Sequence, residues 1–129
     1  MFIRPELRGK DKHGSGAYGA SRGKRKHVGI DFAVDPETPV ASHVDGVVTK
    51  LGYPYGDDLS FRYVQVTDKN QNDHRFFYVE PSVGIGDPIE VGTFIGLSQK
   101  LGSRYKKITE HVHYEVKRGK EYLDPRDFV

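Results

Sequence analysis

The chain has 129 residues, a length that predicts one domain with a single modest hydrophobic core. It contains no cysteine, which excludes disulfides, thiolate metal sites and cysteine nucleophiles, so any metal must be held by His, Asp or Glu. There is no run of about 18 apolar residues, so we expect no membrane span. The first residues also lack the basic-then-apolar pattern of a secretory signal peptide.

Positive charge is concentrated at the start of the chain. Residues 1–26 contain eight Lys or Arg and two acidic residues, although the net charge of the whole chain is only +2. This stretch is rich in Gly, Ser, Lys and Arg and has no hydrophobic period, so it is expected to be a loop-rich lead-in to a domain at 27–129. Such a segment either contacts an anionic polymer, such as a cell-wall polymer, or is a solvated arm without a partner.

Short runs of β-branched and aromatic residues follow, separated by turn-forming residues. This texture predicts a mainly β, single-domain fold, an antiparallel sheet of short strands with long loops. Residues 68–73 are typical of a hairpin tip, and residues 103–108 allow one helical turn at most. The expected strands lie at 28–34, 44–51, 61–67, 75–79, 93–97 and 112–116.

Two histidine spacings are compatible with a metal site. His111 and His113 lie two residues apart in a predicted strand, so both side chains face the same side, about 6.5–7 Å apart at the backbone. His27 and Asp31 would be too far apart in an extended chain, and Gly29 between them permits a bend. The alternative is that these histidines lie on strands and only satisfy local hydrogen bonds, because short spacings also arise by chance.

Longer blocks around these residues resemble the lysostaphin-type zinc metallopeptidases. The resemblance covers residues 15–126, and its blocks occur in the family's order. They are HVGIDFA (27–33), TPVA (38–41), DGVV (45–48), VGIGDPIEVGTFIG (83–96), HVHYEV (111–116) and the terminal Asp124-Pro125.

The resemblance implies that His27, Asp31 and His113 bind one zinc ion per chain, in a groove lined by the long loops. His111 would be the general base, and the activity would be hydrolysis of peptide cross-links in bacterial peptidoglycan through a metal-activated water. Three protein ligands leave a position open for water or a peptide carbonyl, and an adjacent imidazole can take up the proton. The bond that is cleaved is not predicted, because it depends on loops near 53–60 and 100–109.

One position departs from the family. Its hairpin ends in a Tyr-x-His-Leu-like stretch whose His stabilises the oxyanion, and this chain has Glu80 there. An ionised carboxylate cannot donate a hydrogen bond. In a first interpretation, Glu80 is buried and protonated and acts as a hydrogen-bond donor or acid. In a second, Glu80 is the general base and His111 takes another role. Glu80 is catalytic in both interpretations. The third interpretation is an inactive zinc-containing module that binds cell-wall peptides.

The remaining candidates are assigned weaker roles. His43 is expected to be structural or exposed, His13 lies in the basic segment, and His74 lies at the hairpin tip, too far from Glu80 to replace the missing His. A hydroxyl near the oxyanion could come from three tyrosines. Glu115 either orients a ligand His or is an ordinary exposed carboxylate, and the second interpretation is favoured. The three tyrosines are Tyr18, Tyr63 and Tyr78.

The expected protein is therefore a hydrolase of the lysin type, a monomer that degrades cell walls. Nucleic-acid binding is not expected, because residues 1–26 offer few aromatic side chains for base stacking and no known nucleic-acid-binding motif. Without a predicted signal peptide, we expect delivery to the wall by another route, such as a phage particle or a lysis system.

Overall fold

The structure is a computed structural model that describes residues 21–22, 25–26, 28–103 and 108–129. The predicted ligand His27 and most of the basic segment lie outside these residues, and so do the candidates His13 and Tyr18. Within the described ranges, no helix has the length and apolar character needed to cross a membrane.

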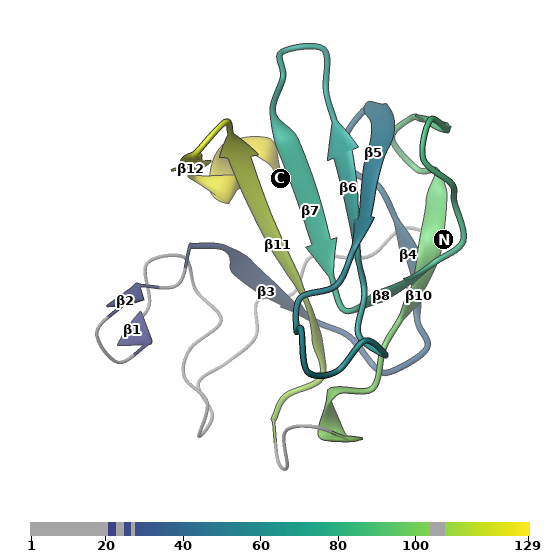
Figure 1. Ribbon diagram of the computed structural model, residues 1–129, viewed down its shortest axis with the longest axis vertical. Helices are drawn as coiled ribbons and strands as arrows, with labels where there is room; N and C mark the ends of the chain where they lie inside the picture. Colours follow the sequence, from purple (N-terminus) through teal and green to yellow (C-terminus); the bar gives the residue numbers. More distant parts are fainter. Residues whose placement is uncertain (1–20, 23–24, 27, 104–107) are drawn as a thin grey trace.

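A seven-stranded antiparallel sheet carries most of the fold (Figure 1). β3 lies outside the continuous strand order and pairs with the first half of β11, on the edge that β12 occupies farther along. The strand order is β12 (Glu121–Leu123), β11 (His111–Arg118), β7 (Asp73–Phe77), β6 (Tyr63–Thr67), β5 (Gly46–Gly52) and β9 (Pro88–Ile89), with β3 at Ile30–Ala33.

A second, three-stranded antiparallel sheet lies beside β5 and β6 in Figure 1. Its order is β4 (Pro39–Ala41), β10 (Phe94–Ser98) and β8 (Val79–Pro81). The shortest elements are β1 (Ser21–Arg22), paired with β2 (Arg25–Lys26), and two 3-10 helices, η1 (Leu101–Ser103) and η2 (Pro125–Phe128).

The predicted mainly β, antiparallel, single-domain fold is confirmed. Each of the six predicted strands overlaps one of the longer observed strands, and β6 and β7 form the predicted hairpin. The expectation that the whole basic segment is loop is wrong at β1 and β2, because a two-residue pair leaves no hydrophobic period in the sequence. η2 was also missed, although Asp124 caps it by accepting a hydrogen bond from the Arg126 N–H.

The two faces of β11 have different environments. Val112, Tyr114 and Val116 point into the core, where they join Val64 and Phe76 and are almost fully buried. Strand alternation therefore turns the other set of side chains, at positions 111, 113 and 115, to the opposite face. The core face fixes the strand in place, and the other face carries the candidate metal centre.

Candidate metal centre

The centre is built where β3 pairs with β11. Asp31 lies directly opposite His113 in the strand register and is 1% exposed. Its Oδ1 is 2.9 Å from His113 Nδ1, and its Oδ2 is 3.6 Å from His111 Nε2. One buried carboxylate therefore contacts both imidazoles of the His-x-His pair, and the two imidazoles share a face as the strand spacing predicted.

His113 is held between two carboxylates. Its second ring nitrogen, Nε2, lies 3.0 Å from Glu115 Oε1, and Arg75 lies 3.6 Å from the other oxygen of Glu115. Burial lowers the pKa of His113, but the hydrogen bonds with Asp31 and Glu115 outweigh it and raise the pKa to about 9 in the metal-free protein. Glu115 is only 5% exposed, so the expectation of an exposed strand carboxylate is wrong, and its contact is the one required to orient His113.

His111 is oriented by the backbone. Its Nδ1 lies 2.6 Å from the carbonyl oxygen of Thr109, which can only accept a hydrogen bond, so Nδ1 carries the proton. In the neutral imidazole the unprotonated nitrogen is then Nε2, on the side of Asp31. The Tyr78 ring and the imidazole form a T-shaped contact, with a centroid distance of 5.5 Å and an angle of 88°. This tautomer presents a basic nitrogen at the centre.

Gly29 lies at a bend directly before β3, as predicted. A Cβ atom there would lie 2.4 Å from the Tyr114 carbonyl oxygen and 2.6 Å from His113 Cε1. No side chain fits at this distance, so the glycine also allows the segment before Asp31 to approach β11 closely.

The described donors suit zinc in their chemistry, although they are too few to form a complete site. Asp31 supplies carboxylate oxygen and His113 supplies imidazole nitrogen, both common zinc ligands. Within the described part of the chain, no three His, Asp or Glu side chains are arranged to hold a metal. The third predicted ligand, His27, lies outside that part, four residues before Asp31.

Glu80 lies apart from this cluster. It is in β8, in the three-stranded sheet, and its side chain is exposed. No hydrogen bond or ion pair joins its carboxylate to the described residues of the cluster. The burial that one interpretation of Glu80 requires is therefore wrong, because the side chain is exposed. The catalytic role of Glu80 stays a prediction.

Tyrosines approach the cluster from the junction between β7 and β8 and from the loop after β5. Tyr78 contacts His111, and its hydroxyl is 2.9 Å from that of Tyr55. Tyr63 instead stacks on Phe77 at 4.7 Å and is 6% exposed. The sequence named Tyr78 as one of three candidates, but Tyr55 was missed, since the only signal was its place in a loop expected to shape the groove.

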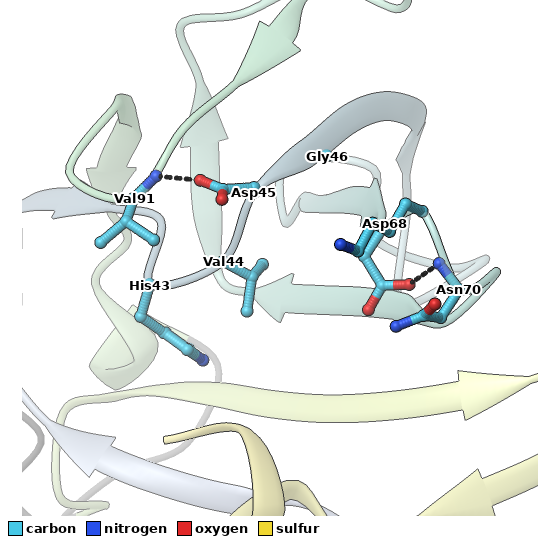
Figure 2. A pocket seen from close by; sticks show the side chains of 8 residues that line it. His43, Val44, Asp45, Gly46, Asp68, Asn70 and Val91 are labelled. Atoms are coloured by element: carbon cyan, nitrogen blue, oxygen red, sulfur yellow. Dashed lines mark hydrogen bonds between the residues drawn. The ribbon is translucent and has the colours of Figure 1, made fainter.

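His43 and His74 belong to a different environment. His74 is fully buried in β7, not at the hairpin tip as predicted, and it bonds Asp68 and Tyr114. His43 packs edge-on against Tyr114 at 4.4 Å, which agrees with a structural role. A cavity of about 420 Å³ lies between the turn before β5 and the hairpin tip. Figure 2 shows His43 beside it. None of the residues lining this cavity belongs to the Asp31 cluster.

Comparison with known proteins gives a consistent result. The family model for "Peptidase family M23" matches residues 25–125. A glycyl-glycine endopeptidase, ALE-1 of Staphylococcus capitis, is 30% identical over 110 residues, which cover 82% of this chain and 28% of that protein. The chain spans less than a third of the length of the curated relatives it matches.

Solved structures share the fold. The structure of LytU has a TM-score of 0.69 and 26% identity, with 95% of this chain and 81% of that chain covered. A zinc-containing peptidase from Vibrio cholerae has a TM-score of 0.61 and 26% identity, covering 76% of this chain and 29% of that chain. The blocks of sequence, the β fold and the family match agree, and the chain belongs to peptidase family M23.

Proposed function

We propose that this chain is a zinc-dependent endopeptidase that hydrolyses peptide cross-links of bacterial peptidoglycan. The observation that carries the proposal is the buried Asp31 carboxylate, which contacts both His111 and His113. Membership of a peptidase family supports peptide hydrolysis. The similarity to a glycyl-glycine endopeptidase supports a glycine-containing bridge as the first substrate to test.

His27, Asp31 and His113 would hold the zinc ion. When bound, zinc supplies a Lewis acid that polarises a peptide carbonyl and makes water a nucleophile near neutral pH. Glu115 contributes by fixing the orientation of His113 through the 3.0 Å contact.

His111 moves the proton. Because its Nδ1–H is held by the Thr109 carbonyl, Nε2 is the nitrogen that accepts a proton from the attacking water. The same nitrogen then donates the proton to the amine that leaves. Groups that act in this way contribute about 10²–10⁴-fold to the rate.

A zinc-containing module that binds cell-wall peptides without cleaving them is the second candidate. It is favoured by one observation, the exposed position of Glu80 where the family has a second catalytic His. In this case Glu80→His would produce cleavage that the natural sequence lacks.

The test is incubation of the zinc-loaded protein with purified cell walls that differ in bridge chemistry. We expect new amino groups and peptide fragments that mass spectrometry assigns to one bond. His111→Ala should lower the rate at least 100-fold and keep its zinc, while Lys120→Ala, in the exposed turn after β11, should match the natural sequence. Zinc binding without cleavage of any wall would contradict the endopeptidase and favour the binding module.

A further inference from the structure

The sheet face that carries the candidate metal centre continues beyond it across β7, β6 and β5 (Figure 1). In the strand register, His113 of β11 lies opposite Phe77 of β7, and Phe77 lies opposite Tyr63 of β6. Residues directly opposite one another share a face of a sheet, so the three rings form one row. Phe77 meets His113 at 5.2 Å and 88°, and Tyr63 stacks on Phe77 at 4.7 Å and 17°. Tyr63 therefore lies two strands, or about 10 Å, from a predicted metal ligand.

The ring of Tyr63 is fixed, but its hydroxyl group has no partner. A Cβ atom at Gly52, opposite Tyr63 in β5, would lie 2.5 Å from the hydroxyl oxygen, so the glycine leaves the space that this group occupies. No residue that the structure describes forms a hydrogen bond with the hydroxyl. Among the described side chains that are not exposed, only His43 has an enclosed polar atom without a partner, so the Tyr63 hydroxyl is open to solvent. It can donate a hydrogen bond to a bound molecule.

Two cations flank this ring. Lys50 Nζ lies 5.7 Å from the centre of the Tyr63 ring, and Arg75 Cζ lies 5.4 Å from it, both within the distance of a cation–π contact. Lys50 is exposed, and no carboxylate of the described residues forms an ion pair with it. Its charge is therefore available to a ligand.

Arg75 is held in one position and keeps part of its guanidinium available. Its Nε–H donates to Gln65 Oε1 at 2.9 Å, and Gln65 is itself held by a 3.0 Å hydrogen bond to Thr49. Nη1 lies 3.6 Å from Glu115, the carboxylate that also contacts His113. Within the described part of the chain Nη2 has no partner, and the side chain is 20% exposed. A planar guanidinium fixed in this way can bind a carboxylate with its remaining N–H groups.

The three side chains together suit an anionic group. Lys50 and Arg75 bring two positive charges to one ring, and Glu115 offsets only part of them because it also contacts His113. Hydrogen bonds from such cations to a carboxylate are strong, and the Tyr63 hydroxyl adds a neutral donor. An extended peptide advances about 3.3 Å per residue, so a peptide bound at the metal centre reaches Tyr63 with a group about three residues away.

We infer that Lys50, Tyr63 and Arg75 form a substrate subsite that binds a free carboxylate of the peptide, about three residues from the bond being cleaved. The inference rests on the proposed peptidase function and adds a determinant of its specificity. A wall peptide with a carboxylate at this distance is preferred over the same peptide with an amide there.

The test uses three peptides with a pentaglycine core that differ only in their end groups. N-acetyl-pentaglycine amide is neutral, N-acetyl-pentaglycine has a carboxylate at its C-terminal end, and N-succinyl-pentaglycine amide has one at its N-terminal end. We expect one of the two charged peptides to be cleaved with a KM about tenfold lower than that of the neutral peptide, at a similar kcat. Sodium chloride at about 1 M should reduce this preference, because it shortens the Debye length to about 3 Å.

Two variants connect the preference to the subsite. Lys50→Gln removes one charge, and Tyr63→Phe removes only the hydroxyl and keeps the stacked ring. Each should reduce the ratio of the two KM values about threefold or more. Lys120→Gln, at an exposed lysine in the turn after β11, is the matched control and should keep the full ratio. Thermal unfolding verifies that the variants fold.

A second measurement does not depend on turnover. The three peptides are titrated by calorimetry into the zinc-loaded His111→Ala variant, alone and combined with Lys50→Gln or Tyr63→Phe, and Kd should show the same preference and the same losses. Equal KM values for the three peptides would overturn the subsite and leave the endopeptidase intact. If the natural sequence cleaves no wall and no peptide, the proposed function fails and the Kd values decide about the subsite. The absence of a preference, or a preference that Lys50→Gln and Tyr63→Phe leave unchanged, would then overturn it.

Discussion

Glu115 is buried because neighbouring side chains cover it. On the sequence it is an acidic residue two positions after His113 in a strand, which is compatible with solvent exposure. In the fold it is enclosed by His113 and by Arg75 of β7. Its carboxylate therefore interacts with the ring of the predicted metal ligand His113 and is not hydrated like an exposed carboxylate.

Glu115→Gln tests this role at the scale of one residue. The substitution keeps an oxygen that can accept from His113 Nε2 but removes the negative charge. We expect zinc affinity to fall about 10–100-fold, as for other partners of ligand histidines. Competition with a fluorescent chelator measures the affinity, and Glu121→Gln on the exposed strand β12 is the matched control. Unchanged affinity would show that Glu115 only packs.

At the scale of elements, β3 and β11 must approach closely for Asp31 to reach both histidines. Gly29 allows this approach, because a side chain at this position would have no room. The contact involves backbone as well as the His113 ring, so relaxation of a side chain cannot relieve it.

Gly29→Ala should therefore both destabilise the fold and weaken the centre. We expect the free energy of unfolding to fall by about 1–3 kcal/mol, the usual cost of overpacking, together with a loss of zinc affinity. Urea unfolding and metal titration measure the two effects. Gly56→Ala is the control, because a Cβ at that position meets nothing within 4 Å. Equal behaviour of the two variants would contradict the close approach of β3 to β11.

The tip of the β6–β7 hairpin is fastened by Asp68. Its carboxylate accepts hydrogen bonds from the N–H groups of Asn70 and Asn72, and Oδ2 lies 2.9 Å from His74 Nε2. These bonds oppose the effect of partial burial and lower the pKa of Asp68 to about 2. The other ring nitrogen of His74 forms a hydrogen bond with the Tyr114 hydroxyl in β11. Asp68 and His74 therefore connect the hairpin tip to the strand that carries the candidate metal centre.

Asp68→Ala should lower the free energy of unfolding by about 2–4 kcal/mol, because it leaves the buried His74 without its charged partner. Urea unfolding at neutral pH measures the change. Lys69→Ala, at the next and exposed position, should have little effect. Equal stability of the two variants would show that Asp68 does not hold the tip.

At the scale of the whole molecule, buried histidines make stability depend on pH. Burial, together with the nearby His74, lowers the pKa of His43 from 6.5 to about 4. The groups around it are Phe76 and His74 of β7 and Tyr114 of β11. Figure 2 shows Asp45 in the same turn as His43 and Asp68 on the far side of the cavity, which Lys69 also lines. His43 therefore stays neutral in the fold where the unfolded chain becomes protonated.

The free energy of unfolding should fall as the pH is lowered from about 6.5 to about 4. In this window the unfolded state binds more protons, and the shift of His43 corresponds to about 3 kcal/mol. The lowered pKa of the buried His74 acts in the same direction, and Asp68 adds a further loss below about pH 3.8.

Urea unfolding of the metal-free protein across this range measures the effect, and His43→Phe, which keeps a ring against Tyr114, should flatten the profile. A variant as pH-sensitive as the natural sequence would contradict the assignment to His43.

The local sequence pattern was sufficient to predict the longer strands and the shared face of His111 and His113. Alternation in β11 predicted that His111 and His113 share a face, because a strand repeats every two residues whatever it packs against. The turn residues after β6 predicted the hairpin, because a tight turn also depends on residues that are neighbours in the chain. The family resemblance then implied that Asp31 and His113 bind one zinc ion. The register of β3 and β11 places the two residues opposite each other, and their role as ligands stays a prediction.

Properties that depend on distant segments were decided only by the tertiary structure. The sequence by itself determined a cysteine-free, mainly β domain with histidine and carboxylate donors in strands. It did not determine that Glu115 is buried, that Glu80 faces solvent or that His74 bonds Tyr114, since burial depends on which strands pack together. Nor did it indicate the left-handed backbone of Tyr78, which has φ of 70°. The Tyr78 N–H donates to the Arg62 carbonyl and the Gln99 N–H donates to the Tyr78 carbonyl, so this conformation depends on segments far apart in the chain.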